Sequence, residues 1–206
     1  VSALAEWIDF DFAGQLPEKA FVLGLKPLLT SKIQVEKVII KDDFSSRHHS
    51  VGKWYRYHVW TGPNRPPVAI RKWCFHAPLE TDNLCEMNEI LSDLVGEHDF
   101  SSFRSAHCSA AHAFRRLSAV KVSRSEIRPD LLYIDVWGNA FVMHQVRIIA
   151  GTMIDILNAS LKNTMFEILK AQDRTLAGQT LPGSGLCLMH MYFPFMEKEA
   201  DNRIWI

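Results

Sequence analysis

Asn139–Gly151, which reads NAFVMHQVRIIAG, lies at the centre of the predicted fold. Apolar residues recur there and just beyond it at roughly helical spacing: Phe141, Val142, Val146, Ile149, Met153 and Ile154. This spacing predicts a helix with most of its faces buried. Arg147 is the only Lys or Arg in the segment. A buried arginine keeps its charge and usually has a carboxylate or phosphate partner, so Arg147 either pairs with an anion or extends to the surface along its own stem.

On either side of this helix the pattern predicts alternating strands and helices. The strands expected are Leu4–Phe12, Ile33–Ile40, Tyr55–Trp60, Leu117–Val122, Leu131–Val136 and Gly185–Phe193. The helices expected are Pro17–Leu29, Leu84–Val95 and Thr164–Ala171. We therefore predict an α+β fold with helices on one face of a largely antiparallel sheet. Phe44–Gly52 is polar and rich in Ser and His, which is typical of a junction and divides the chain into subdomains 1–48 and 49–206.

The charges are segregated although the net charge of the 206 residues is zero. The stretches from Phe44 to Leu79 and from Phe100 to Ser125 contain Lys and Arg but no Asp or Glu. Such segregation favours a basic face on a neutral protein, which suits a phosphate backbone. Taken singly, each stretch could also be an ordinary solvated strand surface.

Other composition signals bound the class of protein. Hydrophobic residues make up 48% of the chain, enough for a core, but no apolar run is long enough to cross a bilayer and no signal peptide is visible at the Val1 end. Four scattered cysteines, without a CxxC pair or a histidine at metal-ligand spacing, indicate reduced thiols and no metal. We expect an intracellular protein, most simply cytoplasmic, with the nucleus or mitochondrion left open.

Six short motifs follow one another along the chain. They are VSA at Val1–Ala3, FSSR at Phe44–Arg47, KWYRY at Lys53–Tyr57, GEHDF at Gly96–Phe100, NAFVMHQVR at Asn139–Arg147 and GLCL at Gly185–Leu188. In this order they resemble the TruA-type tRNA pseudouridine synthases over nearly the whole chain. The sequence departs from the family pattern at Ser2, Gln145 and Cys187, where His, Met and Tyr are common.

The resemblance implies isomerisation of particular tRNA uridines to pseudouridine, without a metal or other cofactor, by a homodimer. It implies two ferredoxin-like-related subdomains with an active-site cleft between them. Residues 1–48 would be the second half of an RNA-binding subdomain, and 49–206 the catalytic subdomain. It also places the family's catalytic Asp three positions before Val1, so we expect this chain by itself to be inactive.

The resemblance further assigns roles to individual residues. Arg147 would pair with the missing Asp, and Tyr55 would stack on the uracil, its hydroxyl helping at C5. Substrate contacts are expected from Leu186, Phe141, His98 and Asp99, with Asp99 more simply orienting its loop than acting in catalysis. Phosphate contacts are expected from Arg47, Lys53, Arg104 and Arg115. The plainer alternatives are a sheet tyrosine at Tyr55 and a core leucine at Leu186.

Two other functions remain open from the sequence. A tRNA-binding relative without activity would keep the basic stretches and lose the chemistry. A ferredoxin-like interaction module would have no RNA role, and its Arg147 would pair with Asp or Glu at an interface. Salt-dependent binding of tRNA would be expected of both the synthase and the inactive relative, and not of the interaction module.

Overall fold

The computed structural model describes residues 1–79, 81 and 83–196. It divides the chain into two compact units. The large unit joins Val1–Glu6 to the chain from Ser50 onward, and the small unit is Trp7–His49. The roles predicted for subdomains 1–48 and 49–206 remain predictions.

The small unit has one regular element, helix α1 (Glu18–Leu25), which starts after Pro17 and is shorter than predicted. The predicted strands Leu4–Phe12 and Ile33–Ile40 are wrong, because neither segment forms a strand; only Leu4 bonds one, through its N–H to the Leu188 carbonyl of β7. Phe12 instead packs edge-on against Phe21 of α1, with ring centroids 5.0 Å apart. An alternating pattern specifies a strand only where a partner accepts its backbone hydrogen bonds.

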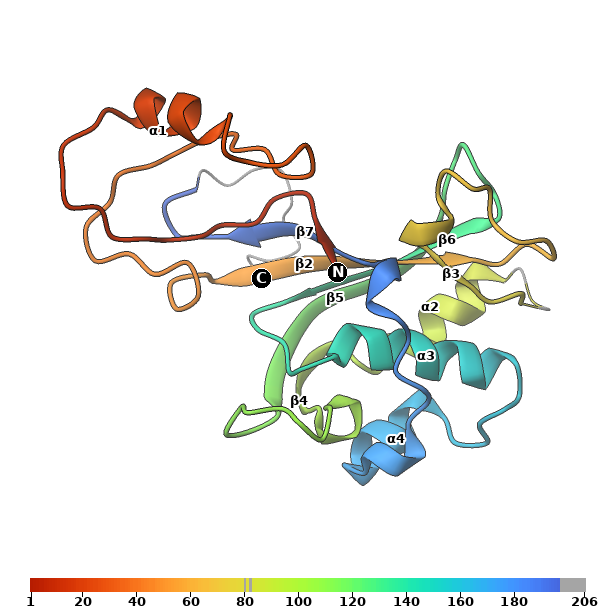
Figure 1. The fold of residues 1–206 in the computed structure, drawn as a ribbon. Helices are drawn as coiled ribbons and strands as arrows, with labels where there is room; N and C mark the ends of the chain where they lie inside the picture. Colours follow the sequence, from red (N-terminus) through yellow and green to blue (C-terminus); the bar gives the residue numbers. More distant parts are fainter. Residues whose placement is uncertain (80, 82, 197–206) are drawn as a thin grey trace. The chain divides into compact units, whose positions relative to one another are not determined.

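The large unit is built on a seven-stranded sheet (Figure 1). Its strands are β1 (Ser2–Ala3), β2 (Gly52–Trp60), β3 (Phe75–His76), β4 (Gly96–Asp99), β5 (Phe114–Arg124), β6 (Leu131–Gly138) and β7 (Leu186–Tyr192). The order is β1-β7-β2-β6-β5-β4, with β3 beside β2. Only the β1–β7 and β2–β3 pairs are parallel. This confirms the predicted α+β class, its largely antiparallel sheet and the strands corresponding to β2, β5, β6 and β7.

Helices cover one face of this sheet (Figure 1). They are α2 (Leu84–Ser92), α3 (Gln145–Leu157) and α4 (Met165–Ala171). At the start of α2 the Asn83 carboxamide accepts hydrogen bonds from two backbone N–H groups, and α4 starts with a capping box between Thr164 and Glu167. Both caps supply partners for helix N–H groups that have none within the helix.

Helix α3 begins at Gln145, four residues later than the apolar spacing from Phe141 suggested. His144, just before it, has a φ of 65°, in the left-handed region that a helix does not use. The Gln145 side chain turns back and accepts a hydrogen bond from the Val142 N–H at 2.9 Å. From Gln145 to Ile154 every residue except Arg147 is buried, which confirms the prediction of a helix buried on most faces.

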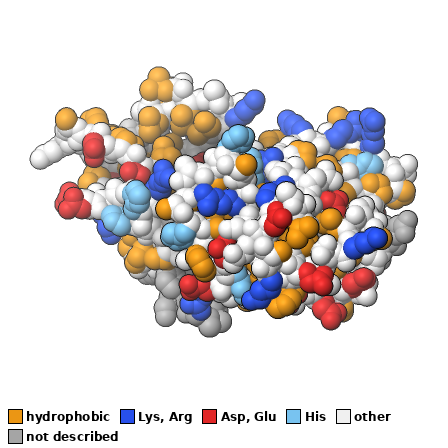
Figure 2. Space-filling view, turned by 90° about the horizontal axis from the view of Figure 1, so that it is seen from below, with side chains coloured by type: hydrophobic (Ala, Val, Ile, Leu, Met, Phe, Trp, Pro, Cys, Tyr) orange, Lys and Arg blue, Asp and Glu red, His pale blue; other side chains and the backbone are white. Residues whose placement is uncertain are grey.

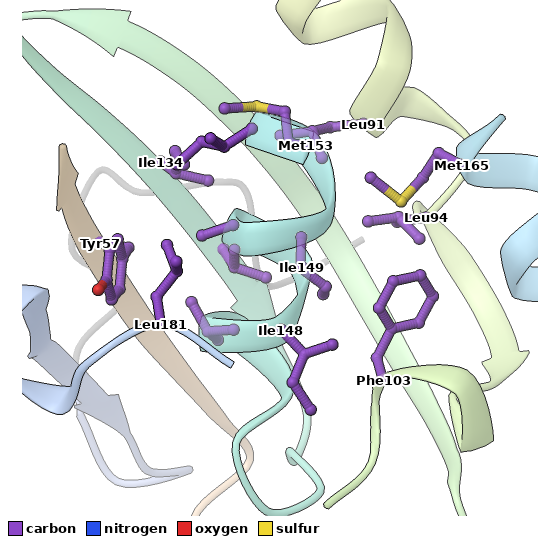
Figure 3. Close-up of a cluster of buried hydrophobic side chains, with 14 of the residues drawn as sticks. Tyr57, Leu91, Leu94, Phe103, Ile134, Ile148, Ile149, Met153, Met165 and Leu181 are labelled. Atoms are coloured by element: carbon purple, nitrogen blue, oxygen red, sulfur yellow. The ribbon is translucent and has the colours of Figure 1, made fainter. Parts of the chain in front are cut away.

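The hydrophobic core lies between the sheet and these helices (Figure 3). Side chains alternate along β2, so Tyr55, Tyr57 and Val59 face the helices. Tyr57 and Ile149 are fully buried in this core. Trp54 and Arg56 lie on the other face, where Arg56 makes a bidentate ion pair with Asp135 of β6. Among the described residues, no helix is both long and apolar enough to cross a membrane.

Candidate active site

Arg147 lies in the first turn of α3 and is half-buried among buried neighbours. Its Nε donates to the Leu181 carbonyl at 2.5 Å. Within the described part of the chain, no carboxylate lies within 4.0 Å of its guanidinium. A Cβ built at Gly183 would lie 3.9 Å from Arg147 Nη1 and 3.5 Å from the Val1 nitrogen. The guanidinium and the first residue of the chain therefore border the same point.

Tyr55 lies on β2, half-buried and on the same face of the sheet as α3. The Phe141 ring meets it edge-on, with centroids 5.1 Å apart and an interplanar angle of 83°. The structure thus brings together two aromatic residues that the sequence had singled out separately. Burial raises the pKa of Tyr55, and the nearby charge of Glu6 raises it further. The hydroxyl is consequently a hydrogen-bond donor at neutral pH.

A cavity of about 210 Å³ opens beside Tyr55. Its lining residues are Val1, Ser2, Ala3, Glu6, Tyr55 and Leu188. A single water needs about 10–15 Å³ by this kind of measure, so there is room for a larger group. Glu6 is the only acidic residue of the lining and was not singled out from the sequence.

Leu186 and Leu188 occupy neighbouring positions on the helix-covered side of β7. Leu186 pairs with Tyr57 and is buried in the main core, whereas Leu188 pairs with Tyr55 and lines the cavity. The sequence predicts Leu186 as the apolar contact, which remains a prediction, and does not single out Leu188. The GLCL motif contains both leucines, and only the register of β7 against β2 distinguishes them.

His98 and Asp99 lie on β4, at the opposite edge of the sheet from β1. Strands β6 and β5 separate them from β2, so the structure does not bring them to the cavity beside Tyr55. Asp99 accepts hydrogen bonds from the backbone N–H and the hydroxyl of Ser101, at 2.8 and 2.6 Å. Asp99 therefore orients the loop after β4, as the sequence indicated, and substrate contact by either residue remains a prediction.

The four predicted phosphate contacts have different surroundings. Arg47 is exposed in the small unit, and Lys53 is half-buried on β2. Arg104 donates through Nη2 to the Cys108 and Ala110 carbonyls and so orders its own loop, and Arg115 donates to nearby carbonyls of its own segment. On the face in Figure 2, the coloured Lys and Arg side chains are interspersed with acidic and hydrophobic ones rather than gathered in one field. Contact with RNA by these residues remains a prediction.

The described residues contain no group of three or more His, Cys, Asp or Glu side chains arranged to hold a metal ion. All four cysteines are free thiols.

Comparison with known proteins places this chain in one class of RNA-modifying enzymes. A family model described as tRNA pseudouridine synthase matches residues 90–194. The tRNA pseudouridine synthase A of Myxococcus xanthus is 36% identical over 196 residues, which cover 94% of this chain and 72% of the relative. That of Hydrogenovibrio crunogenus is 33% identical over 198 residues, 94% of this chain and 73% of the relative. The chain belongs to the tRNA pseudouridine synthase family.

Proposed function

We propose that this chain forms the larger part of the active site of an enzyme that isomerises uridine to pseudouridine in tRNA. The observation that supports this most is the half-buried Arg147, which has no carboxylate partner among the described residues and lies, like the cavity-lining Val1, beside Gly183. In the reaction the bond between ribose C1′ and uracil N1 breaks, the base turns, and C1′ bonds to C5. The proton lost from C5 is balanced by one gained at N1. A base stacked in a tRNA stem must first be flipped out to reach a pocket.

Arg147 would hold the carboxylate that acts beside the sugar. The resemblance gives that role to an Asp three positions before Val1. Val1, three positions after that Asp, and the Arg147 Nη1 atom both border Gly183, which supports an ion pair close by. Losing one partner of a buried pair costs about 3–5 kcal/mol, because the other charge is left without water.

Tyr55 would stack on the flipped uracil, with Phe141 fixing the plane of its ring. The edge-on contact at 5.1 Å supports this division of roles. Stacking of a base on an aromatic side chain contributes roughly 1–3 kcal/mol. Leu188, which pairs with Tyr55 across the two strands and lines the cavity, would supply the apolar contact expected from Leu186.

Arg47, Lys53, Arg104 and Arg115 would contact tRNA phosphates in a homodimer located inside the cell. The acid-free stretches that contain these four residues and the four free thiols support this part of the proposal. Contacts to the phosphate backbone position RNA and add affinity without reading its sequence.

Two measurements on the full-length protein separate this proposal from its alternatives. Affinity for tRNA should fall with salt, with a slope that shrinks by about one for each phosphate-contacting residue replaced. Nucleoside analysis of unmodified tRNA after incubation should show new pseudouridine. Salt-independent or absent binding would leave the interaction module, and binding without pseudouridine would leave the inactive relative.

A further inference from the structure

We propose that Tyr57 is a positioning residue for this site. Its hydroxyl fixes the turn Leu181–Leu186, and that turn fixes the guanidinium of Arg147. The inference rests on the proposed function, since Arg147 is the residue whose orientation matters for catalysis. Tyr57 is fully buried on the face of β2 that the helices cover, and its contacts extend to this turn.

The hydroxyl of Tyr57 donates to the Pro182 carbonyl at 2.8 Å, across 125 residues of sequence. Leu181, the residue before Pro182, is joined to Arg147 twice. Arg147 Nε donates to the Leu181 carbonyl at 2.5 Å, and the Leu181 N–H donates to the Arg147 carbonyl at 3.4 Å. The carbonyl that accepts from Tyr57 and the carbonyl that accepts from Arg147 therefore belong to adjacent residues, Pro182 and Leu181.

Close packing on the other side of the turn keeps Tyr57 in place. A Cβ built at Gly185 would come within 2.7 Å of Tyr57 Cζ, so the tyrosine lies against backbone that only glycine leaves open. Leu186, the next residue, pairs with Tyr57 across the two strands. Figure 3 shows the Tyr57 ring beside Leu181 at the edge of the core next to α3. The ring is thus held between the two ends of the turn.

Electrostatics agree with a donor hydroxyl at this position. Burial raises the pKa of Tyr57, and the positive charge of Arg147 opposes the shift only in part. The hydroxyl therefore keeps its proton and donates a hydrogen bond to the Pro182 carbonyl.

Removal of the hydroxyl should loosen the turn without opening the core. Pro182 is exposed, so water can take over the bond to its carbonyl in Tyr57→Phe, while the ring keeps its packing. The expected defect is therefore one of orientation. Small displacements of groups that orient a reaction lower its rate by up to ~100-fold.

The test is Tyr57→Phe in the full-length protein, assayed by pseudouridine formation in tRNA. We expect kcat to fall by about ten-fold with KM within about two-fold, because an orienting contact acts in the transition state rather than in binding. The melting temperature should change by no more than a few degrees. Tyr133→Phe is the matched control, since this half-buried β6 residue lies on the opposite face of the sheet, against Arg56 and His58.

A second readout does not depend on activity. Amide hydrogen exchange at Gly183, Gly185 and Leu186 should be faster in Tyr57→Phe than in the wild type, and unchanged in Tyr133→Phe. An unchanged kcat in Tyr57→Phe, or an equal loss in Tyr133→Phe, overturns the inference, as does unchanged exchange in the turn. If the wild type itself forms no pseudouridine, the proposed function fails instead, and exchange still decides whether Tyr57 orders the turn.

Discussion

Arg147 and Leu181 are 34 residues apart in sequence, yet the side chain and the backbone of Arg147 both bond the backbone of Leu181, at its C=O and its N–H respectively. The bond from Nε fixes the plane of the guanidinium. Its two Nη groups have no hydrogen-bond partner in the described part of the chain, and a Cβ built at Gly183 would lie 3.9 Å from Nη1. A planar guanidinium presented in this way suits a carboxylate, which it can bind through two parallel hydrogen bonds.

Replacement of this arginine should abolish most of the activity. For Arg147→Ala we expect kcat to fall by more than about 100-fold, since an ion pair of ~3 kcal/mol or more is lost. Arg147→Lys should recover little, because an ammonium keeps the charge without the planar fork. Single-turnover assays on tRNA check this, with binding affinity measured alongside. A variant that turns over normally would remove Arg147 from the mechanism.

Two substitutions at Tyr55 should separate stacking from the hydroxyl. Tyr55→Ala should weaken the transition state by roughly 1–3 kcal/mol, the range for loss of a stacked aromatic. Tyr55→Phe retains the ring and its edge contact with Phe141, so only a role of the hydroxyl at C5 would lower its rate. Comparison of kcat/KM for the two variants measures each contribution. Equal losses would assign the effect to the hydroxyl rather than to stacking.

The capping box of α4 should affect stability alone. Thr164 Oγ1 accepts from the Glu167 N–H at 3.2 Å, and the Glu167 carboxylate accepts from the Thr164 N–H at 2.9 Å. Thr164→Ala should therefore lower the free energy of unfolding by about 0.5–2 kcal/mol and leave kcat unchanged. Urea denaturation gives the first quantity. Thr164→Ser keeps an oxygen acceptor and should behave nearly as the wild type.

His58 should make the stability of the large unit depend on pH. Burial lowers the pKa of His58 below its ordinary value of 6.5, with the Gly185 carbonyl opposing, Arg56 lowering and Asp135 raising it. The unfolded chain then binds a proton at higher pH than the folded one. Stability is therefore retained above pH 6.5 and is lost as the pH falls toward the folded pKa.

Urea unfolding at several pH values between 5 and 8, compared for wild type and His58→Gln, measures this effect as a difference in slope. The variant should lose less stability on acidification, by at most the binding of one proton. Identical slopes would show that His58 does not contribute.

The sequence was sufficient to predict those strands and helices whose local residue pattern agrees with the neighbours that they have in the fold. Strands β2, β5, β6 and β7 alternate and also pair with one another, and α2 and α4 start at recognisable caps. Leu4–Phe12 alternates equally well, but β1 ends at Ala3, and beyond the bond from the Leu4 N–H to the Leu188 carbonyl the segment does not continue the ladder with β7. Pairing is a property of the whole fold and cannot be read from one segment.

In the candidate site, too, some residues could be predicted from the sequence and others could not. Arg147 and Tyr55 were identified because a charge among apolar residues and a tyrosine in a motif are visible in the sequence. Leu188 depends on strand register, and the bond between Arg147 and Leu181 involves a backbone carbonyl, so neither leaves a signal in side-chain type. The start of α3 was missed for a related reason, since a left-handed His144 and a Gln145 that folds back are not usual helix-start signals.

Tritium release from tRNA labelled at C5 of uridine tests the central claim most directly, because isomerisation replaces the C5–H bond with a bond to the ribose. The full-length protein should release tritium, and replacing the Asp that the resemblance places three positions before Val1 by Ala should abolish release while tRNA binding persists. Tritium release that survives this substitution would contradict the assignment of an Asp-dependent uridine isomerase in which Arg147 pairs with that Asp. So would a wild type that binds tRNA but releases no tritium.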